Sequence, residues 1–279
     1  MKNFFSLTQL DRMQIKQVVE IAGQMRRTLN SKNKKLPYLS GRYFAQLTQK
    51  HNLLNTAYQL AYNYLGGDTV VTTSTGDFCQ EAQQVCASGV SLLGLSHDNY
   101  AIIEQVASSC SCQLLNMGTK FTNPIKALSI LTTIADKCDR IGNLNVITLG
   151  YADLSFIAEL SYAFKLFDTN FFAYLPTNDT EFTQKSNIIV LNSAQSAFEG
   201  ADAIIDLGVQ YSSQLDYYGN KLGIPKSLIG KARVDAPLFF NRNYVDNNNL
   251  VEYPFNVVDK ESNNFISVIM AVFYLFFKV

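Results

Sequence analysis

Ala57-Tyr58-Gln59-Leu60-Ala61-Tyr62-Asn63-Tyr64-Leu65-Gly66-Gly67 is the stretch of this 279-residue sequence that decides its fold class. It forms most of a predicted helix, Asn55 to Leu65, which the glycine pair ends as a C-terminal glycine cap would. A short buried strand is predicted before it, at Arg42–Leu47, and a β-branched strand after it, at Asp68–Thr73. Strand, helix and strand in this order predict a parallel sheet with a crossover helix.

The same alternation continues along the chain. An earlier helix is predicted to start at Thr8–Asp11. The later elements of the first half are helices at Phe78–Ala87, Tyr100–Ser108 and Pro124–Cys138, and strands at Val90–Leu95 and Gln113–Asn116. The pattern restarts with a strand at Asn145–Gly150 and continues with helices at Leu154–Leu166 and Ser193–Phe198, and strands at Asn170–Leu175, Ser186–Leu191 and Ala203–Leu207. Such repeats predict an α/β protein with two doubly wound parallel-sheet domains joined by helices.

The restart near Asn145 sets the predicted domain boundary. The first domain is expected to span 1–142 and the second 143–261, with a terminal helix at 262–279 packing back on the first. Asn, Tyr and Gly crowd the tract Tyr211 to Asn249, which is expected to be a mobile loop region.

Charge is sparse and balanced. Lys+Arg and Asp+Glu number 23 each, so no net field draws the chain to nucleic acid or anionic lipid, and neither is an expected partner. The basic run Lys32–Lys35 has no interleaved aromatic residues and is expected to be a solvated loop. Charged residues make up only 16%, which favours either a large core or a surface buried between subunits.

The termini and the cysteines bear on location. The uncharged run Phe265 to Phe277 is shorter than the about 20 apolar residues that cross a bilayer, so it predicts no membrane span. A buried terminal helix is favoured over a membrane-surface anchor. The start of the chain has no export signal, and five cysteines without framework spacing predict reduced thiols in a cytoplasmic protein. Cys110-Ser111-Cys112 lacks a second ligand pair, so no metal site is predicted.

Motifs for common cofactors are absent from the sequence. Neither a dinucleotide fingerprint nor a Walker sequence occurs, and no cofactor is predicted. His51 and His97 have no obvious nucleophile partner and are expected to be surface or loop residues and not catalysts. Asp153 and Asp206 follow or end predicted strands, where open α/β sheets place ligands.

The stretch Tyr58–Gly67 and the helix start Asn123-Pro124-Ile125-Lys126-Ala127-Leu128, with the order of elements around them, resemble the aspartate/ornithine carbamoyltransferase family over essentially the whole chain. The pattern is closest to the ornithine enzymes. The resemblance implies a carbamoyl-phosphate-binding-like first domain, an amino-acid-binding-like second domain and a role in amino acid metabolism. It also implies a homotrimer, or a hetero-oligomer with a related carbamoyltransferase.

The family's charged site residues do not occur at the matching positions. Its Ser-Thr-Arg-Thr-Arg phosphate loop is replaced by His51-Asn52-Leu53-Leu54-Asn55, and a further arginine falls near Leu93. Its His-Pro-x-Gln reads Asn123-Pro124-Ile125-Lys126, and its late His-Cys-Leu-Pro or His-Pro-Leu-Pro turn is replaced around Pro237–Asn241. The resemblance therefore implies a vestigial or altered anion pocket made of Lys50, His51, Asn52, Asn55, Asn123 and Lys126. Asp206 matches an aspartate that contacts the amino acid in ornithine enzymes, although the Ser-Met-Gly that should follow is absent.

Three functions follow from this pattern. The leading hypothesis is a pseudoenzyme with a binding or assembly role and no catalytic residue. The alternative is a divergent transferase acting on an amino acid, with Lys50, His51 and Lys126 as a new anion or acid–base site. The third is a carbamoyltransferase with a rearranged loop. An enzyme needs converging titratable groups in its cleft, whereas an assembly protein does not.

Overall fold

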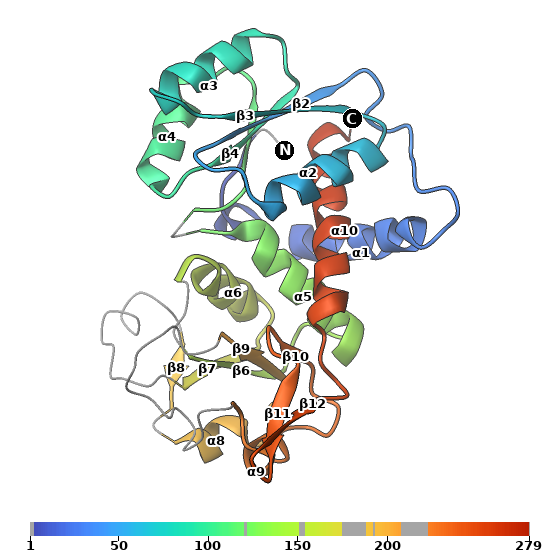
Figure 1. Ribbon diagram of the computed structural model, residues 1–279, viewed down its shortest axis with the longest axis vertical. Helices are drawn as coiled ribbons and strands as arrows, with labels where there is room; N and C mark the ends of the chain where they lie inside the picture. The colour runs from blue at the N-terminus through green and yellow to red at the C-terminus, as the bar shows by residue number, and fades with distance from the viewer. Residues whose placement is uncertain are drawn as a thin grey trace. The chain divides into compact units, whose positions relative to one another are not determined.

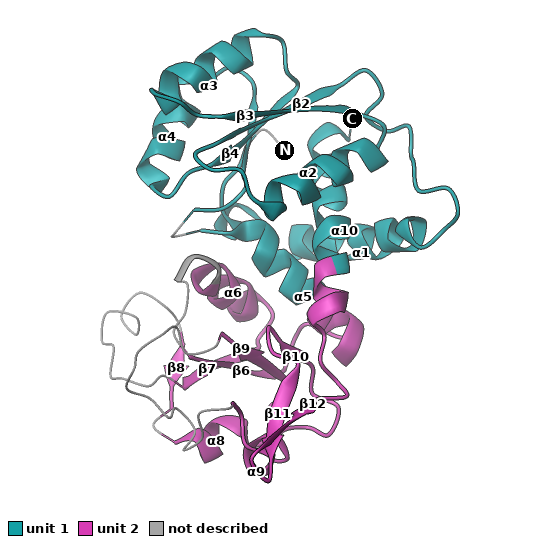
Figure 2. Cartoon of the chain, in the orientation of Figure 1, with its two compact units in different colours: residues 1–132, 263–279 teal, residues 133–262 magenta. Residues whose placement is uncertain are grey.

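The computed structural model describes residues 3–119, 122–150, 154–174, 188–191, 193–207 and 223–278, with only the backbone at 154–156 (Figure 1). It forms two compact units, coloured separately in Figure 2. Unit 1 comprises residues 1–132 and 263–279, and unit 2 comprises residues 133–262. The division falls within helices α5 (Pro124–Cys138) and α10 (Val258–Phe277). The domain boundary at 143, inferred from the strand pattern, stays a prediction.

Unit 1 is built on a five-stranded parallel sheet in the order β1-β5-β4-β2-β3. In chain order the strands are β1 (Asn3–Phe4), β2 (Tyr43–Thr48), β3 (Asp68–Thr73), β4 (Leu92–Ser96) and β5 (Gln113–Asn116). The helices wholly within the unit are η1 (Leu7–Gln9), α1 (Arg12–Leu29), α2 (Leu53–Tyr64), α3 (Phe78–Ala87) and α4 (Tyr100–Ser109).

Different helices cover the two faces of this sheet. Successive strand residues point to opposite sides, so neighbouring residues of β2 contact different helices. On one face, Phe44 stacks on Tyr62 of α2 at 5.2 Å and meets Phe273 of α10 at 4.9 Å, measured between ring centroids. On the other, Ala45 and Leu47 share an apolar cluster with residues of α3 and α4. Gly94 makes room for the Phe44 ring, since a Cβ there would lie 2.8 Å from it.

Unit 2 is also built on a five-stranded parallel sheet, in the order β10-β9-β6-β7-β8. In chain order its strands are β6 (Asn145–Leu149), β7 (Asn170–Tyr174), β8 (Ile189–Val190), β9 (Ala203–Asp206) and β10 (Leu238–Phe239), and its helices include α6 (Leu154–Leu166), α8 (Ala194–Phe198) and α9 (Lys226–Ile229). Two parallel sheets with helices confirm the fold class predicted from the sequence.

An antiparallel hairpin, β11 (Asn243–Asp246) and β12 (Asn249–Glu252), follows β10. Asn247 and Asn248 form its turn in the left-handed conformation, with φ of 50° and 64°. The expectation of a loop region from Tyr211 to Asn249 is wrong where α9, β10 and the hairpin form, while 211–222 lie outside the described residues. Two adjacent asparagines between alternating residues are a hairpin signal, because asparagine tolerates positive φ.

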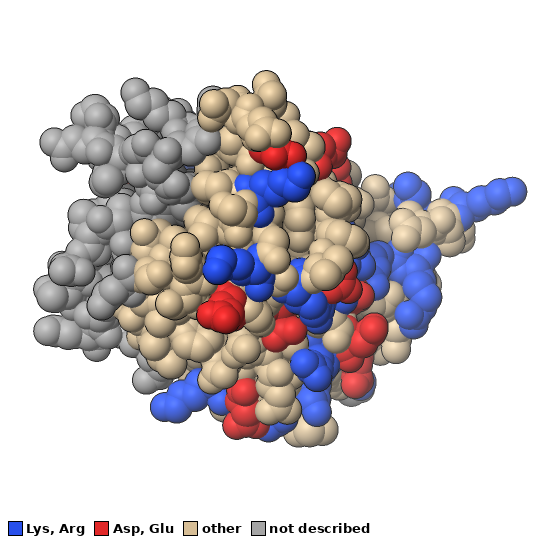
Figure 3. Space-filling view, turned by 90° about the horizontal axis from the view of Figure 1, so that it is seen from below, with Lys and Arg blue, Asp and Glu red and all other residues tan. Residues whose placement is uncertain are grey.

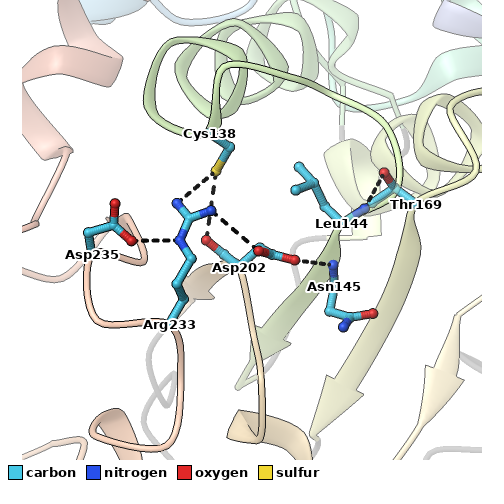
Figure 4. A network of polar contacts seen from close by, with 7 residues as sticks. All are labelled: Cys138, Leu144, Asn145, Thr169, Asp202, Arg233 and Asp235. Carbon is cyan, nitrogen blue, oxygen red and sulfur yellow. Dashed lines mark hydrogen bonds and ion pairs between the residues drawn. The ribbon is translucent and has the colours of Figure 1, made fainter.

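A polar network holds the amino ends of β6 and β9 to the last residue of α5 (Figure 4). The Arg233 guanidinium contacts Asp202 Oδ1 at 3.3 Å, Asp235 Oδ1 at 2.6 Å and Cys138 Sγ at 3.4 Å. Asp202 Oδ2 in turn accepts from the Asn145 backbone N–H at 2.8 Å. Burial raises the pKa of the Cys138 thiol, so this sulfur stays protonated and serves the fold.

The expectation of five reduced thiols is wrong in this structure. Cys86 and Cys112 form a disulfide with Cα atoms 5.5 Å apart, while Cys79, Cys110 and Cys138 are free. The end of α3 and the residue before β5 are 26 positions apart in sequence but pack on the same sheet face. The spacing of the cysteines along the chain therefore does not show that Cys86 and Cys112 lie close together in space.

Charge on the surface follows the composition. On the face shown in Figure 3, Lys and Arg side chains are interspersed with Asp and Glu, with wide uncharged areas between them. Across the described ranges, no helix is both long and apolar enough to cross a membrane.

Candidate functional site

The sheet of unit 1 has a switch point between β2 and β4. The chain goes from β2 to β3 on one side and places β4 on the other side of β2. In open α/β sheets, ligands bind outside the carboxyl ends of the two strands at such a point. The carboxyl ends here are Thr48 and Ser96, so the candidate site is made of the loops that follow them.

These two loops are tied together by hydrogen bonds. The Gln49 backbone N–H donates to the Ser96 carbonyl at 3.2 Å, and the Gln49 side chain accepts from the Asp98 N–H at 3.0 Å. Thr48 Oγ1 bonds both the N–H and the carbonyl of Lys50. These hydrogen bonds hold the two loops to each other.

Helix α2 starts at this switch point and caps itself. Asn52 Oδ1 accepts from the backbone N–H groups of Leu54 and Asn55, at 2.9 and 3.4 Å. Asn55 Oδ1 accepts from the Asn52 N–H at 2.8 Å, which completes a capping box. Two of the helix N–H groups that could receive an anion, those of Leu54 and Asn55, are thus bound by the protein's own side chain.

Asn55 is held in the interior by a buried partner. Its Nδ2 donates to Gln46 Oε1 at 3.0 Å, and Gln46 Nε2 donates to the Asn55 carbonyl at 3.0 Å. Asn55 is 2% exposed and Gln46 is fully buried. The sequence suggests Asn55 as a pocket residue, whereas the structure places it in a closed amide pair. The polar Gln46 within an apolar strand is the sequence signal for that pair.

The rest of this loop is exposed. Lys50, His51 and Asn52 are exposed, and Leu53 is 88% exposed where the family pattern has its first loop arginine. Leu93 lies in the apolar cluster beneath α3 and α4, so a side chain there does not reach the switch point. Ser96, at the end of the same strand, is the residue that does.

Asn123 is bound at the start of α5. Its Oδ1 accepts from the Lys126 N–H at 3.2 Å, and its carbonyl accepts from the Ala127 N–H at 3.1 Å. The Lys126 ammonium lies 5.9 Å from the centroid of the Phe265 ring of α10, in cation–π range. The structure thus links Asn123 with Lys126, and Asn52 with Asn55, each pair by its own backbone contacts.

Unit 2 has its own switch point, between β6 and β9, because β7 and β9 flank β6. Asp206 ends β9 there and is buried. Its Oδ2 accepts from Asn241 Nδ2 at 2.7 Å, and Asn241 Oδ1 accepts from the Asn243 N–H at 3.1 Å. The sequence missed Asn241 as a site residue, although it lies two residues after the end of β10. Asp153 lies outside the described residues.

Two other features do not add to these sites. A cavity of about 530 Å³ in unit 1 is lined from β1, η1, α1 and α10, by Asn3, Phe4, Gln9, Leu10, Gln14, Gln17, Val18 and Leu275. It includes none of the loop residues at the β2–β4 switch point. Within the described part of the chain, no group of three or more His, Cys, Asp or Glu residues could hold a metal ion.

Comparisons with known proteins agree with the resemblance in the sequence. No family model matches the chain. Aspartate carbamoyltransferase catalytic subunits from Caldicellulosiruptor bescii and Carboxydothermus hydrogenoformans are 23% and 24% identical to it. These alignments cover 99% and 98% of this chain, and 97% and 95% of the relatives.

Solved structures show the same fold. The ornithine carbamoyltransferase of Thermus thermophilus superposes with a TM-score of 0.83 at 17% identity, covering 100% of this chain and 99% of that one. The aspartate transcarbamoylase of Trypanosoma cruzi, solved with carbamoyl aspartate and phosphate, gives 0.78 at 16% identity, covering 98% and 94%.

Proposed function

Because this chain is a divergent member of the aspartate/ornithine carbamoyltransferase family, we propose that it keeps the family's fold without carrying out carbamoyl transfer. It serves instead as a binding or assembly protein. The observation that carries this proposal is the self-capped start of α2, where the Asn52 side chain accepts from the N–H groups of Leu54 and Asn55 and the Asn55 side chain accepts from the Asn52 N–H.

The absence of the two loop arginines supports the same proposal. A hydrogen bond to a charged group contributes about 1.5–3 kcal/mol, so replacing the two loop arginines by Leu53 and Asn55 removes roughly 3–6 kcal/mol of anion binding. That is on the order of a hundred- to twenty-thousandfold in affinity. Lys50 is near in sequence, but an ammonium does not reproduce the bidentate fork of a guanidinium.

Proton transfer is affected separately. Asn123 stands where the family pattern has a histidine, and its amide oxygen is used as the cap of α5. An amide donates and accepts hydrogen bonds but does not titrate near neutral pH, so it supplies no general acid or base.

A partner subunit is part of the proposal. The curated relatives are named catalytic subunits, which places them in assemblies. Tyr43 and Val70, 50% and 52% exposed on the adjacent strands β2 and β3, give this chain apolar surface to cover. We infer a homotrimer, or a hetero-oligomer with a related carbamoyltransferase, in the cytoplasm. Light scattering should give a mass well above 31.2 kDa, and a monomer at micromolar concentration would remove this part.

The alternative is a transferase that acts on an amino acid. The Asp206–Asn241 pair at the second switch point favours it, because a buried carboxylate with an amide partner suits an ammonium group. Calorimetry with aspartate and with ornithine tests that ligand class. Amino-acid binding without carbamoyl transfer supports a binding protein, whereas steady turnover with any carbamoyl donor supports the transferase.

The decisive experiment is calorimetry with carbamoyl phosphate, followed by a product assay with aspartate or ornithine. The Caldicellulosiruptor bescii relative is the positive control. We expect no binding at micromolar concentration and no product. Leu53→Arg should gain roughly ten- to a hundredfold in affinity, since one charged hydrogen bond returns at an exposed position. Leu60→Arg, on the same helix and 40% exposed, is the matched control and should gain nothing. Micromolar binding by the unaltered protein would overturn the proposal.

A further inference from the structure

The cavity of about 530 Å³ lies beside β1, the strand at one edge of the unit 1 sheet. Its lining comes from β1, η1, α1 and α10, and every lining residue belongs to unit 1. Sites for small molecules have volumes of about 300–1,000 Å³, so this cavity has room for one. The loops after β2 and β4 do not line it, and it is therefore separate from the candidate site described above.

Part of the cavity wall is apolar and held in place by the fold. Phe4 and Val18 are fully buried, Leu10 is 4% exposed, and Leu275 of α10 is half-buried. Phe4 pairs with Leu115 in the sheet, so this part of the wall is fixed by strand pairing. An apolar group of a ligand can contact such a wall without first ordering it, which favours binding.

The rest of the wall carries amide side chains whose oxygens are already bonded. Gln9 Oε1 accepts from the backbone N–H groups of Phe5 and Ser6 at 2.6 and 3.1 Å, in the capping box of η1. Gln14 Oε1 accepts from the backbone N–H of Asp11 at 2.9 Å, in the capping box of α1. Because only the oxygen of an amide accepts, these bonds also fix which end of each amide is its nitrogen.

The side-chain nitrogens are what these amides can still offer to a ligand. Asn3 repeats the arrangement, since its Oδ1 accepts from the Leu114 N–H at 3.1 Å. Within the described ranges, the side-chain nitrogens of Asn3, Gln9 and Gln14 form no hydrogen bond, and the Gln17 side chain forms none at either end. The cavity therefore presents mainly hydrogen-bond donors beside an apolar wall.

The cavity wall also lacks charge. None of the described residues that line it is charged. An ion that enters such a cavity loses part of its hydration without gaining an opposite charge, which is costly. A neutral molecule with oxygen acceptors loses less hydration and gains the amide donors.

We propose that this cavity binds a neutral small molecule that has an apolar group and two or more carbonyl oxygens, such as a cyclic amide. The apolar group packs against Phe4, Val18 and Leu275, and the carbonyl oxygens accept from the side-chain nitrogens of Gln9 and Gln14. This inference goes beyond the proposed function and does not rest on it.

Nuclear magnetic resonance of the full-length, ¹⁵N-labelled protein tests the proposal. The probe is the cyclic dipeptide of glycine and leucine, which is neutral and has two carbonyl oxygens and one apolar side chain. We expect the side-chain amide signals of Gln9 and Gln14 to shift in a saturable way at millimolar concentration. The linear dipeptide of the same residues, which is charged at both ends, and the cyclic dipeptide of two glycines, which has no apolar group, should bind at least about tenfold more weakly.

Isosteric variants test the amide donors. Gln9→Glu and Gln14→Glu replace the donor nitrogen by an oxygen, while the other oxygen still accepts the backbone bonds of each capping box. Each variant assigns its own amide signal and should bind the cyclic probe about tenfold more weakly. Gln24→Glu makes the same change of charge at an exposed position of α1 outside the cavity, and should bind as the wild type does.

A further variant covers the case in which a capping box is damaged. Urea unfolding shows whether Gln9→Glu or Gln14→Glu is destabilised. Gln17→Glu breaks no side-chain hydrogen bond of the described residues, so it should weaken binding of the cyclic probe without lowering stability.

Three results would overturn the proposal. One is the absence of a saturable shift of the Gln9 and Gln14 signals. Another is equally tight binding of the linear dipeptide, which would show that the cavity does not select a neutral ligand. The third is unchanged affinity in all three cavity variants. None of these results depends on carbamoyl phosphate, so they are distinct from failure of the proposed function.

Discussion

Replacing Asn55 by alanine tests whether the start of α2 is built for stability rather than for a ligand. The change removes the bond to Gln46 Oε1 and the bond to the Asn52 N–H. Gln46 is fully buried, so its oxygen is left unpaired at a cost of about 1–3 kcal/mol. Loss of the reciprocal cap contact adds about 0.5–1 kcal/mol. We therefore expect Asn55→Ala to lower the free energy of unfolding of unit 1 by about 1.5–4 kcal/mol.

A double-mutant cycle makes this prediction sharper. Gln46→Met removes the other partner, and combining it with Asn55→Ala removes both ends of the buried amide pair. The double variant should lose about 1–3 kcal/mol less than the sum of the single variants, because the two residues contact each other. Asn63→Ala, an exposed position on the same helix, is the control and should change stability by less than about 0.5 kcal/mol.

The assay must separate the two units. The chain has no tryptophan, so urea unfolding is followed by far-ultraviolet circular dichroism. A protein with two compact units need not unfold in one step, so hydrogen exchange is used to assign the loss to β2 and α2. If Asn55→Ala unfolds at the wild-type urea concentration, or the double variant loses the full sum, Asn55 is not a fixed part of the fold. Either result would contradict the proposal that the start of α2 serves the fold and not a ligand.

Four further outcomes are expected. Gly94→Ala should lower the free energy of unfolding by about 1–3 kcal/mol, because the added Cβ meets the Phe44 ring. Gly23→Ala on α1 is the matched control and should raise the free energy of unfolding by about 0.5–1 kcal/mol, because its added Cβ has no atom within 4 Å. Urea unfolding measures both changes. Arg233→Ala should lower the stability of unit 2 by about 1–3 kcal/mol by leaving the Asp202 carboxylate poorly paired, and exposed Arg140→Ala should have little effect. Ending the chain at Ser262 should cause aggregation, seen by light scattering, because Phe273 then no longer covers Phe44 and Tyr62; a soluble, equally stable product contradicts this. The rate at which the free thiols of Cys79 and Cys110 are alkylated, measured by peptide mapping, should rise about tenfold per pH unit below the thiol pKa, because both pKa values are raised and only the thiolate attacks; a flat profile contradicts it.

The fold was predictable because its decisive signals are local. The glycine pair after α2 is required by contacts as well as by conformation. Gly66 has φ of +86°, and a Cβ at Gly67 would lie 2.1 Å from the Tyr62 ring. Both residues are read directly from the sequence. The strand–helix alternation needs only periodicity, which is why both sheets were predicted.

The site was predicted less well, because its features depend on residues that are distant in sequence. Gln46 meets Asn55 across nine positions, so the spacing of the family pattern does not show that Asn55 is buried. Leu93 and Ser96 lie on one strand, and only the sheet order shows which of them reaches the switch point. The Cys86–Cys112 bond depends in the same way on two segments meeting over the sheet.

The complete hydrogen bonding of the polar side chains at the start of α2 bears on function. Functional sites are where proteins break local rules, with unpaired polar groups or strained backbone, because a ligand completes them. In the described residues, the buried side-chain oxygens without a partner belong to Tyr58, Tyr62, Glu81, Thr148 and Ser161. None of these is a residue of the predicted anion pocket. At α2, the cap, the capping box and the buried amide pair are instead all satisfied by the protein. Under the proposed function, a carbamoyl phosphate at this helix start would compete with the cap for the N–H groups of Leu54 and Asn55, and no arginine in the loop would add to its binding. A helix start that is completed by the protein's own side chains, in a loop without arginine, is what the proposed binding or assembly role predicts.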